Sequence, residues 1–261
     1  MTGLEFTTDR VTRPPPGGID VEATLSHFAI ITYKVDPEKL RPHVHDRFDL
    51  DCILDRDGAS KALVSMVPFL DRDFRLARYP WPRSSFGQTN YRAYVRDSRT
   101  GEHVVWFFGT ALASIFVQIP RYLWKLPWHH ARMRFETRYD EARHRYVDYR
   151  LSTQSKWAPC ALELEDSGES PLELDGFSSL ESALVLLTHP LRGYFYLRNG
   201  RLGTYTIWHD RLDMTLGRIR TATIPLFDRL GLVPEGDLSQ VHSVLIQPET
   251  EFTIYLPPTR A

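Results

Sequence analysis

One strand-like segment brings together residue types that bind oxyanions. In Thr89 to Asp97, TNYRAYVRD, the alternation of a β-strand places Asn90, Arg92 and Tyr94 on one face. A guanidinium offers paired donors to a carboxylate or enolate oxygen and stabilises negative charge that develops there. The hairpin partner, Val104 to Phe108, is apolar on both faces, which favours cover on both sides of the sheet. We therefore predict that Arg92 and Asn90 face a covered cavity; the alternative is a solvated sheet face.

Two further residues could carry catalysis. His129 leads the apolar face of the alternating segment Pro127 to Arg138, where an imidazole could move a proton. The alternative is a histidine packed in the core. Lys125 stands in an apolar setting and would be a nucleophile if buried; the alternative is an ordinary cation at a helix C-terminus. Arg92, His129 and Lys125 are the candidate catalytic residues.

Aromatic side chains suggest a ligand-binding wall. Tyr194 and Tyr196 share one face of a strand, and His209 ends the strand that pairs with it. Together with Trp106 they could line a pocket for an apolar or aromatic ligand; the alternative is aromatic packing between strands.

The elements that must position these residues are mostly strands. Asp36 and Pro37 begin a short helix that ends near Val44, and a capping box at Ser178 to Glu181 begins a helix that runs to Leu187. A third helix is expected over 111–124. Asn199-Gly200 is a tight-turn signal between two strands. Strands are expected at 28–35, 48–54, 61–69, 89–97, 102–110, 131–139, 146–154, 193–198, 201–209 and 241–256. Many antiparallel hairpins with a few helices predict an α+β fold.

Composition excludes several classes of protein. The chain has 261 residues, with Lys+Arg 32 against Asp+Glu 33, so no basic surplus exists to bind nucleic acid. Two cysteines far apart predict neither a disulfide framework nor a zinc site, and a cytoplasmic location is the default. The uncharged run Val104 to Pro120 is shorter than the roughly 20 residues that a bilayer requires. No nucleotide, triad-hydrolase or zincin motif is present, so we expect no cofactor and no metal.

Several segments, taken in order, resemble a known family. They are KVDPEKLRPHV, ALVSMVPF, TNYRAYVRD with EHVVWFF, RYLWKLPWHHARM and GYFYLRNGRL. They resemble the YqjF-like family of uncharacterised proteins, in the acetoacetate decarboxylase-like superfamily. Residues 1–20, which contain a run of prolines and glycines, are expected to form a flexible or extended arm. The resemblance implies one domain at 21–261, with a curved, mostly antiparallel sheet or barrel around a central cavity and a few flanking helices.

The resemblance also departs from the decarboxylases at their reactive lysine. Here the corresponding segment reads Trp124-Lys125-Leu126-Pro127-Trp128-His129, so Trp128 and His129 stand where the lysine pair is expected and Lys125 is displaced. Trp128 therefore joins the candidate binding residues. We predict a cofactor-independent enzyme, lyase-like, acting on a small keto acid or related carbonyl compound. The alternative is a non-catalytic binding protein for an apolar ligand. A small molecule is the expected partner, with no nucleic acid and no membrane, and a homo-oligomer is compatible with the sequence.

Overall fold

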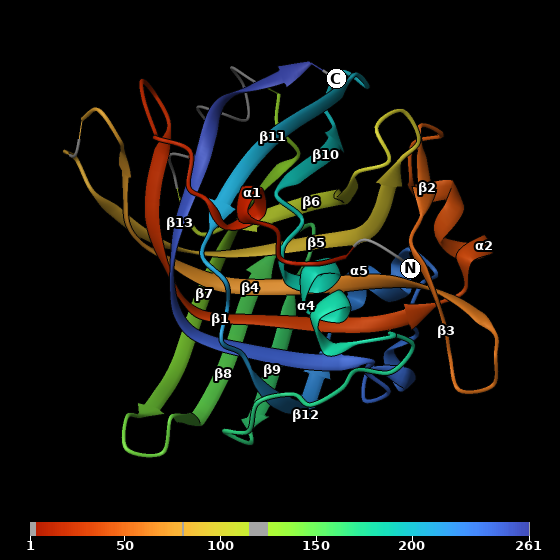
Figure 1. Cartoon of the computed structure of the whole chain (residues 1–261). Coiled ribbons are helices and arrows are strands. Elements are labelled where there is room, and N and C mark those ends of the chain that lie inside the picture. The colour runs from red at the N-terminus through yellow and green to blue at the C-terminus, as the bar shows by residue number, and fades with distance from the viewer. Residues whose placement is uncertain (1–3, 80, 115–124, 261) are drawn as a thin grey trace.

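Strands dominate the chain, as its alternating segments predict. The computed structural model describes residues 4–79, 81–114 and 125–260, and thirteen strands form one sheet in it (Figure 1). The strands are β1 (Val21–Val35), β2 (Phe48–Leu50), β3 (Cys52–Leu54), β4 (Ser60–Leu76), β5 (Ser84–Asp97), β6 (His103–Leu112), β7 (Trp128–Asp140), β8 (Arg145–Ser155), β9 (Cys160–Asp166), β10 (Arg192–Tyr196), β11 (Leu202–His209), β12 (Thr215–Thr223) and β13 (Ser243–Arg260).

The helices are short, and their ends follow local capping rules. They are α1 (Thr8–Val11), α2 (Pro37–Leu40), α4 (Leu180–Thr188) and α5 (Pro225–Arg229), with 3-10 turns η1 (Arg41–His43) and η3 (Glu235–Asp237). Asp36 caps α2, as predicted, by accepting a hydrogen bond from the Glu38 amide. The α4 capping box lies one residue later than predicted, between Ser179 and Ser182. Glu181 is therefore free to accept a bond from the Phe6 amide.

The sheet curves until it closes on itself. The strands β13, β1, β4, β5, β6, β10 and β11 pair in that order, and β11 pairs again with β13, so these strands form a closed path that we call the cavity ring. The strands β7, β8, β9 and β12 form a second path from β6 back to β13. The pairings β6–β7 and β6–β10 are parallel, while the others are antiparallel. The curved, mostly antiparallel architecture predicted from the sequence is confirmed.

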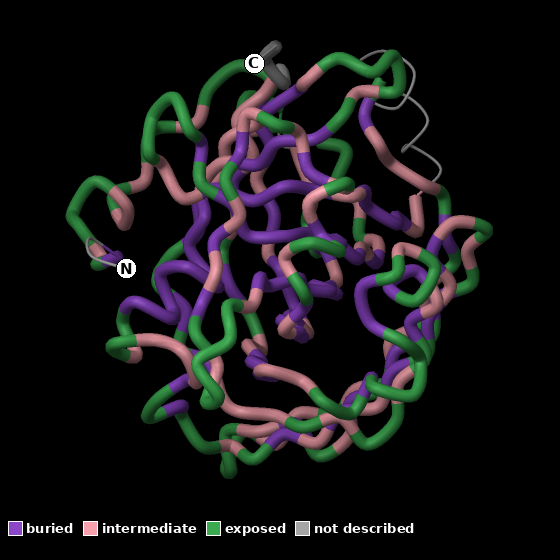
Figure 2. Tube along the Cα trace, turned by 90° about the vertical axis from the view of Figure 1, so that its right-hand side faces the viewer, coloured by how far each residue is buried: buried purple, intermediate pink, exposed green. Residues whose placement is uncertain are grey.

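Two apolar cores lie on opposite sides of β1, β4, β5, β6, β10 and β13, which contribute residues to both cores and which we call the shared strands. Figure 2 shows the buried segments concentrated toward the middle of the molecule. The first core packs Tyr91, Ala93 and Val95 of β5 against β8, β9 and Phe227 of α5. The second core lies inside the cavity ring and includes Tyr94 of β5 and the apolar residues of α4. Alternate residues of β5 therefore serve different cores, as the period of a strand requires.

The structure also corrects several sequence expectations. The strand expected at 48–54 is two strands, because Phe48–Leu50 pairs with β5 and Cys52–Leu54 pairs with β4. The predicted start of the helix over 111–124 is wrong, because residues 111 and 112 continue β6 and pair with β5. Residues 115–124 lie outside the described part of the chain. The strands β9 and β12 were not predicted. Both lie inside the sheet, between β8 and β13, but polar residues interrupt the apolar ones along each strand, so the apolar signal is weak.

The N-terminal segment lies against the body of the protein. Leu4 is buried in the second core, the indole of Trp208 donates to the carbonyl of Val11, and Tyr255 donates to the carbonyl of Pro14. Asp20 fixes the end of this segment, because its carboxylate accepts from the amides of Gly17 and Leu256. No helix in the described ranges is both long and apolar enough to cross a membrane.

Candidate functional site: an apolar cavity inside the sheet

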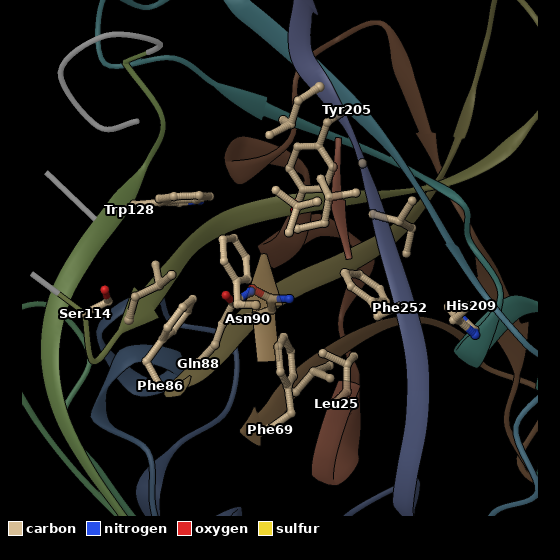
Figure 3. A pocket seen from close by; sticks show the side chains of 18 of the residues that line it. Leu25, Phe69, Phe86, Gln88, Asn90, Ser114, Trp128, Tyr205, His209 and Phe252 are labelled. Carbon is tan, nitrogen blue, oxygen red and sulfur yellow. The ribbon is translucent and has the colours of Figure 1, made fainter. Parts of the chain in front are cut away.

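The cavity ring encloses a space of about 710 Å³. In Figure 3, aromatic side chains from four strands of the ring and from β7 project toward the space around Asn90: Phe69, Phe86, Trp128, Tyr205 and Phe252. Aliphatic side chains fill most of the remaining wall, including Val21, Leu25, Val67, Val105, Leu112, Ile207 and Ile254. A cavity of this size and lining is suited to an organic molecule with a large apolar surface.

One strand brings polar groups into this apolar wall. Gln88, Asn90 and Arg92 alternate along β5 and all line the cavity; we call them the polar stripe. The Asn90 Oδ1 atom accepts from Gln88 Nε2 at 3.0 Å and from Thr110 Oγ1 at 2.9 Å, which fixes the amide's orientation. The shared face predicted for Asn90 and Arg92 is therefore observed, and it faces a covered cavity.

A hydrogen-bonded network with Tyr94 and the carbonyl of Leu187 holds the Arg92 side chain in place. Its Nη2 atom donates to the carbonyl of Leu187 at 2.8 Å and lies 3.3 Å from the hydroxyl of Tyr94. Tyr94 itself donates to Leu187 at 3.2 Å and contacts Ser65 at 2.8 Å. Tyr94, which was predicted to bind substrate, is fully buried and does not line the cavity. Its observed contacts position Arg92.

Among the described residues, no carboxylate lies beside the Arg92 guanidinium in the cavity. Arg92 is buried, and its Nε atom has no hydrogen-bond partner among the described residues. No aspartate, glutamate or lysine occurs among the described lining residues. A buried cation without a counter-ion is costly, and an anionic ligand group would remove that cost through charge-assisted hydrogen bonds.

The floor of the cavity is the C-terminal end of α4. The last carbonyls of a helix have no partner within the helix, and here side chains supply one. Arg92 donates to Leu187, and His209 Nε2 lies 2.9 Å from the carbonyl of Thr188. His209 lines the cavity and its Nδ1 lies 2.7 Å from the carbonyl of Asp210. Burial lowers the pKa of His209, so the imidazole is neutral near pH 7 and donates its one N–H to only one of these two carbonyls.

The mouth of the cavity is apolar and exposed. Ile19, Leu76, Tyr79 and Trp81 line the opening, and the Trp81 side chain is 82% exposed. The amide of Ala77 donates to the carbonyl of Asp20, which brings the end of β4 beside the residue that follows Ile19. The mouth is therefore built by two segments that are distant in sequence.

Asp71 is a buried acid that the sequence analysis missed. It is 2% exposed and its Oδ2 atom has no partner among the described residues. Its register partners Leu25 on β1 and Phe86 on β5 both line the cavity, so Asp71 belongs to the same face. Val67, Phe69 and Asp71 alternate along β4, and an aspartate continuing an apolar face is the signal that could have identified it.

Burial raises the pKa of Asp71 well above its ordinary value of 3.8, so the folded protein keeps a proton that the unfolded chain releases. Stability then falls as the pH rises above about 4, because the folded state binds more protons. Asp71→Asn removes this titration. We expect its melting temperature to exceed that of the wild type by about 5 °C near pH 8 and to differ little near pH 4. Thermal unfolding across this range tests it; equal curves at both pH values would contradict it.

Three predicted binding residues lie on the wrong side of the sheet. Val105 and Phe107 of β6 line the cavity, so Trp106 between them points away. Tyr194 is the parallel partner of Trp106, and both belong to the first core. The Trp106 ring packs edge-on against Tyr196 with centroids 4.9 Å apart. Tyr194 and Tyr196 share a face, as predicted, and Trp106 lies on the same side of the sheet, but this side is opposite the cavity.

Tyr194 also belongs to a buried ion pair. Arg47 binds Asp97 through two hydrogen bonds, at 3.0 and 2.7 Å, and Tyr194 lies 3.3 Å from the same carboxylate. The bond from Arg47 holds the pKa of Asp97 below its ordinary value. The contact with the Arg47–Asp97 ion pair therefore accounts for the position of the Tyr194 hydroxyl.

The two other catalytic candidates do not line the cavity. His129 stacks on Trp157, with centroids 4.1 Å apart and planes 9° from parallel, on the face of β7 that carries Ala131 and Met133. Lys125 is exposed, so the burial that its nucleophile role required is not met. All five lysines of the chain are described, and none lines the cavity. Trp128, the neighbour of His129, does line it.

The described part of the chain offers no obvious metal centre. It contains no group of three or more histidine, cysteine, aspartate or glutamate side chains placed to hold an ion. Both cysteines are free thiols, and neither lines the cavity. The chemistry available at the polar stripe is therefore anion binding by Arg92 and hydrogen bonding by two amides.

Solved structures with the same architecture are acetoacetate decarboxylase-like proteins. An acetoacetate decarboxylase from Legionella pneumophila is 12% identical, with a TM-score of 0.58 over 97% of this chain and 94% of that chain. The enduracididine biosynthesis enzyme MppR complexed with pyruvate is 13% identical, with a TM-score of 0.57 over 95% and 91%. An acetoacetate decarboxylase-like enzyme from Sphingomonas wittichii is 8% identical, with a TM-score of 0.55 over 94% of both.

These similarities establish the fold and not the activity, because the identities are low. A search of curated protein sequences found no significant match. The model of one protein family, DUF2071, described as an uncharacterized conserved protein, matches residues 22–251. This match includes most of the cavity ring, α4 and every residue of the polar stripe. The chain belongs to the DUF2071 family and has an acetoacetate decarboxylase-like fold.

Proposed function

We propose that this protein binds an amphipathic organic acid, with the acid group at Arg92 and a long or bulky apolar body in the rest of the cavity. The observation that carries the proposal is a buried guanidinium, with an unpartnered Nε, in a large apolar cavity whose described lining has no carboxylate. An anionic head group would pair with the charge of the guanidinium and accept a hydrogen bond from its unpartnered Nε. The aromatic and aliphatic walls would bury the remainder of the ligand.

The polar stripe determines where the head group binds. Arg92 supplies charge, and Asn90 and Gln88 continue the line of polar groups toward the mouth. A second oxygen beside the acid, as in a keto or hydroxy acid, would lie within reach of these amides. The ligand class is thus an acid with an apolar tail, with room for one more oxygen near the acid.

A small keto acid fits this cavity less well. The volume of about 710 Å³ greatly exceeds a three-carbon acid, and burial of apolar surface supplies most of the affinity in such sites. A cofactor-independent reaction on a carbonyl compound would have to use Arg92 for charge stabilisation and His209 for proton movement, since Lys125 and His129 lie elsewhere. Binding of the apolar acid is the function the site supports best. We also take the chain to be a YqjF-like member of its family, on the segments quoted above.

The test is ligand binding in solution. We expect hexadecanoic acid to bind the purified, delipidated protein more tightly than hexadecan-1-ol, by about tenfold, because only the acid carries a charge for Arg92. Pyruvate is the control for a small acid without an apolar body and should not raise the melting temperature at millimolar concentration. Calorimetry and thermal shift measure both effects. Equal affinity for acid and alcohol, or saturation by pyruvate, would contradict the proposal.

A further inference from the structure

Exposed apolar side chains gather at one place on this protein. The described chain has eight large hydrophobic residues with exposed side chains, and four of them line the cavity mouth. They are Ile19 at 41%, Leu76 at 37%, Tyr79 at 57% and Trp81 at 82% exposure; we call them the mouth patch. Scattered exposed hydrophobic residues need no explanation, but a contiguous group around an opening does.

The mouth patch lies at the outer end of a long hairpin. β4 pairs with β1 up to its last residue, Leu76, whereas the first residues of β5 extend past its pairing with β6, which begins at Gln88. Figure 1 shows the loop end of this hairpin projecting at the side of the sheet. The hairpin's loop and the end of the N-terminal segment are joined by the bond from Ala77 to Asp20. The patch is thus presented outward on a fixed base, where a flat surface could meet it.

Arginines surround the patch. Arg75, Arg78 and Arg83 stand among its aromatic residues, and the Arg78 guanidinium lies 5.7 Å from the centre of the Tyr79 ring. Arg75 pairs with Glu22, and Arg83 pairs with Asp73 at 3.7 Å. No salt bridge is formed by Arg78 among the described residues. Tryptophan and tyrosine next to arginine are the residue types that occupy the interface of a lipid bilayer, where rings contact the acyl boundary and cations contact anionic head groups.

We propose that the mouth patch docks on the surface of an anionic lipid membrane, so that the cavity opens toward the bilayer. This inference rests on the proposed function, because an acid with a long apolar tail resides mainly in membranes. The apolar wall is continuous from Trp81 and Tyr79 at the surface to Phe86 and Phe252 inside. A ligand could therefore pass from the bilayer into the cavity with little exposure of its tail to water. The docking is peripheral and involves side chains of one loop and the residues beside it.

The experiment is vesicle flotation of the full chain. Vesicles are either pure phosphatidylcholine or phosphatidylcholine with about 30% phosphatidylglycerol. We expect several-fold more protein on the anionic vesicles at low salt, with the difference reduced at high salt by screening. The variant Tyr79→Ser/Trp81→Ser should lose binding to anionic vesicles by about tenfold. The matched control is Leu54→Ser/Leu172→Ser, which removes two exposed apolar residues away from the mouth and should bind like the wild type.

Solution binding of hexadecanoic acid separates this inference from the proposed function. The wild type and Leu54→Ser/Leu172→Ser should bind the free acid alike, within about threefold, because the control leaves the cavity wall unchanged. Tyr79→Ser/Trp81→Ser should keep the preference for the acid over hexadecan-1-ol, because Arg92 is unchanged. Acid binding without vesicle binding overturns the docking proposal alone, whereas absence of acid binding overturns the proposed function. Equal loss of vesicle binding in both double variants also overturns docking at the mouth. A second copy of the chain is the other possible occupant of the mouth patch, and light scattering measures the oligomeric state that tests it. If the wild type were a dimer and Tyr79→Ser/Trp81→Ser a monomer, the patch would be a dimer interface and the inference would be overturned.

Discussion

Arg92→Met is expected to weaken binding of hexadecanoic acid by about a hundredfold, or roughly 2.7 kcal/mol, while leaving the affinity for hexadecan-1-ol within about threefold of the wild type. Methionine keeps the length and apolar stem of arginine and removes the charge and its donors. The acid then loses its charge-assisted hydrogen bonds, whereas the alcohol retains its contacts with the apolar wall. Calorimetric titration of both ligands measures the difference.

The same substitution separates ligand binding from structural support. Arg92 donates to Leu187 at the end of α4, but the Tyr94 hydroxyl donates to the same carbonyl, so that carbonyl keeps a partner in the variant. We therefore expect a small change in melting temperature. Arg92→Lys keeps the charge and loses the paired donors, and its affinity for the acid should lie between those of Arg92→Met and the wild type. A variant that unfolds, or one that loses acid and alcohol binding equally, would make Arg92 a structural residue.

Trp106→Ala is expected to lower the free energy of unfolding by about 3 to 5 kcal/mol without changing ligand affinity. Trp106 is 1% exposed and packs against Phe48 and Tyr196, so its removal leaves a void in the first core. The cavity wall is unaffected because the indole points to the other side of β6. Urea denaturation measures the first effect, and titration with hexadecanoic acid at a temperature where the variant is folded measures the second.

The adjacent residue provides the matched control. Phe107 lines the cavity and stacks on Tyr205 with centroids 5.7 Å apart. Phe107→Ala should therefore change affinity for the apolar tail as well as stability. If Trp106→Ala reduced acid binding as strongly as Phe107→Ala, the assignment of these neighbours to opposite faces would be wrong.

Much of the fold follows from local patterns in the sequence. The hairpin of β5 and β6, the strands β7 and β8, and the hairpin around Asn199-Gly200 were predicted because alternation and turn residues are local properties. The wrong predictions arise where an element depends on a partner strand. Residues 111 and 112 continue a strand because they pair with β5, and helical spacing of apolar residues does not reveal such a partner.

The candidate site was partly predictable for the same reason. Alternation alone placed Asn90, Arg92 and Tyr94 on one face, and the structure has them there. The sequence could not tell how deep each side chain lies, so Tyr94 was taken as a ligand contact although it lies beneath Arg92. Asp71 escaped notice because its importance depends on burial and on the neighbours Leu25 and Phe86 from two other strands.

The sequence by itself determined which side chains share a face of a strand, since a strand has a period of two residues wherever it lies. It grouped Tyr194 with Tyr196, and it separated His129 from Trp128. Which of the two faces meets the cavity was decided only by the tertiary structure. The shared strands have an apolar core on each side, so hydrophobicity cannot distinguish the sides. The closure of β11 on β13 and the position of α4 leave one side with empty space, and both depend on contacts between segments far apart in the chain.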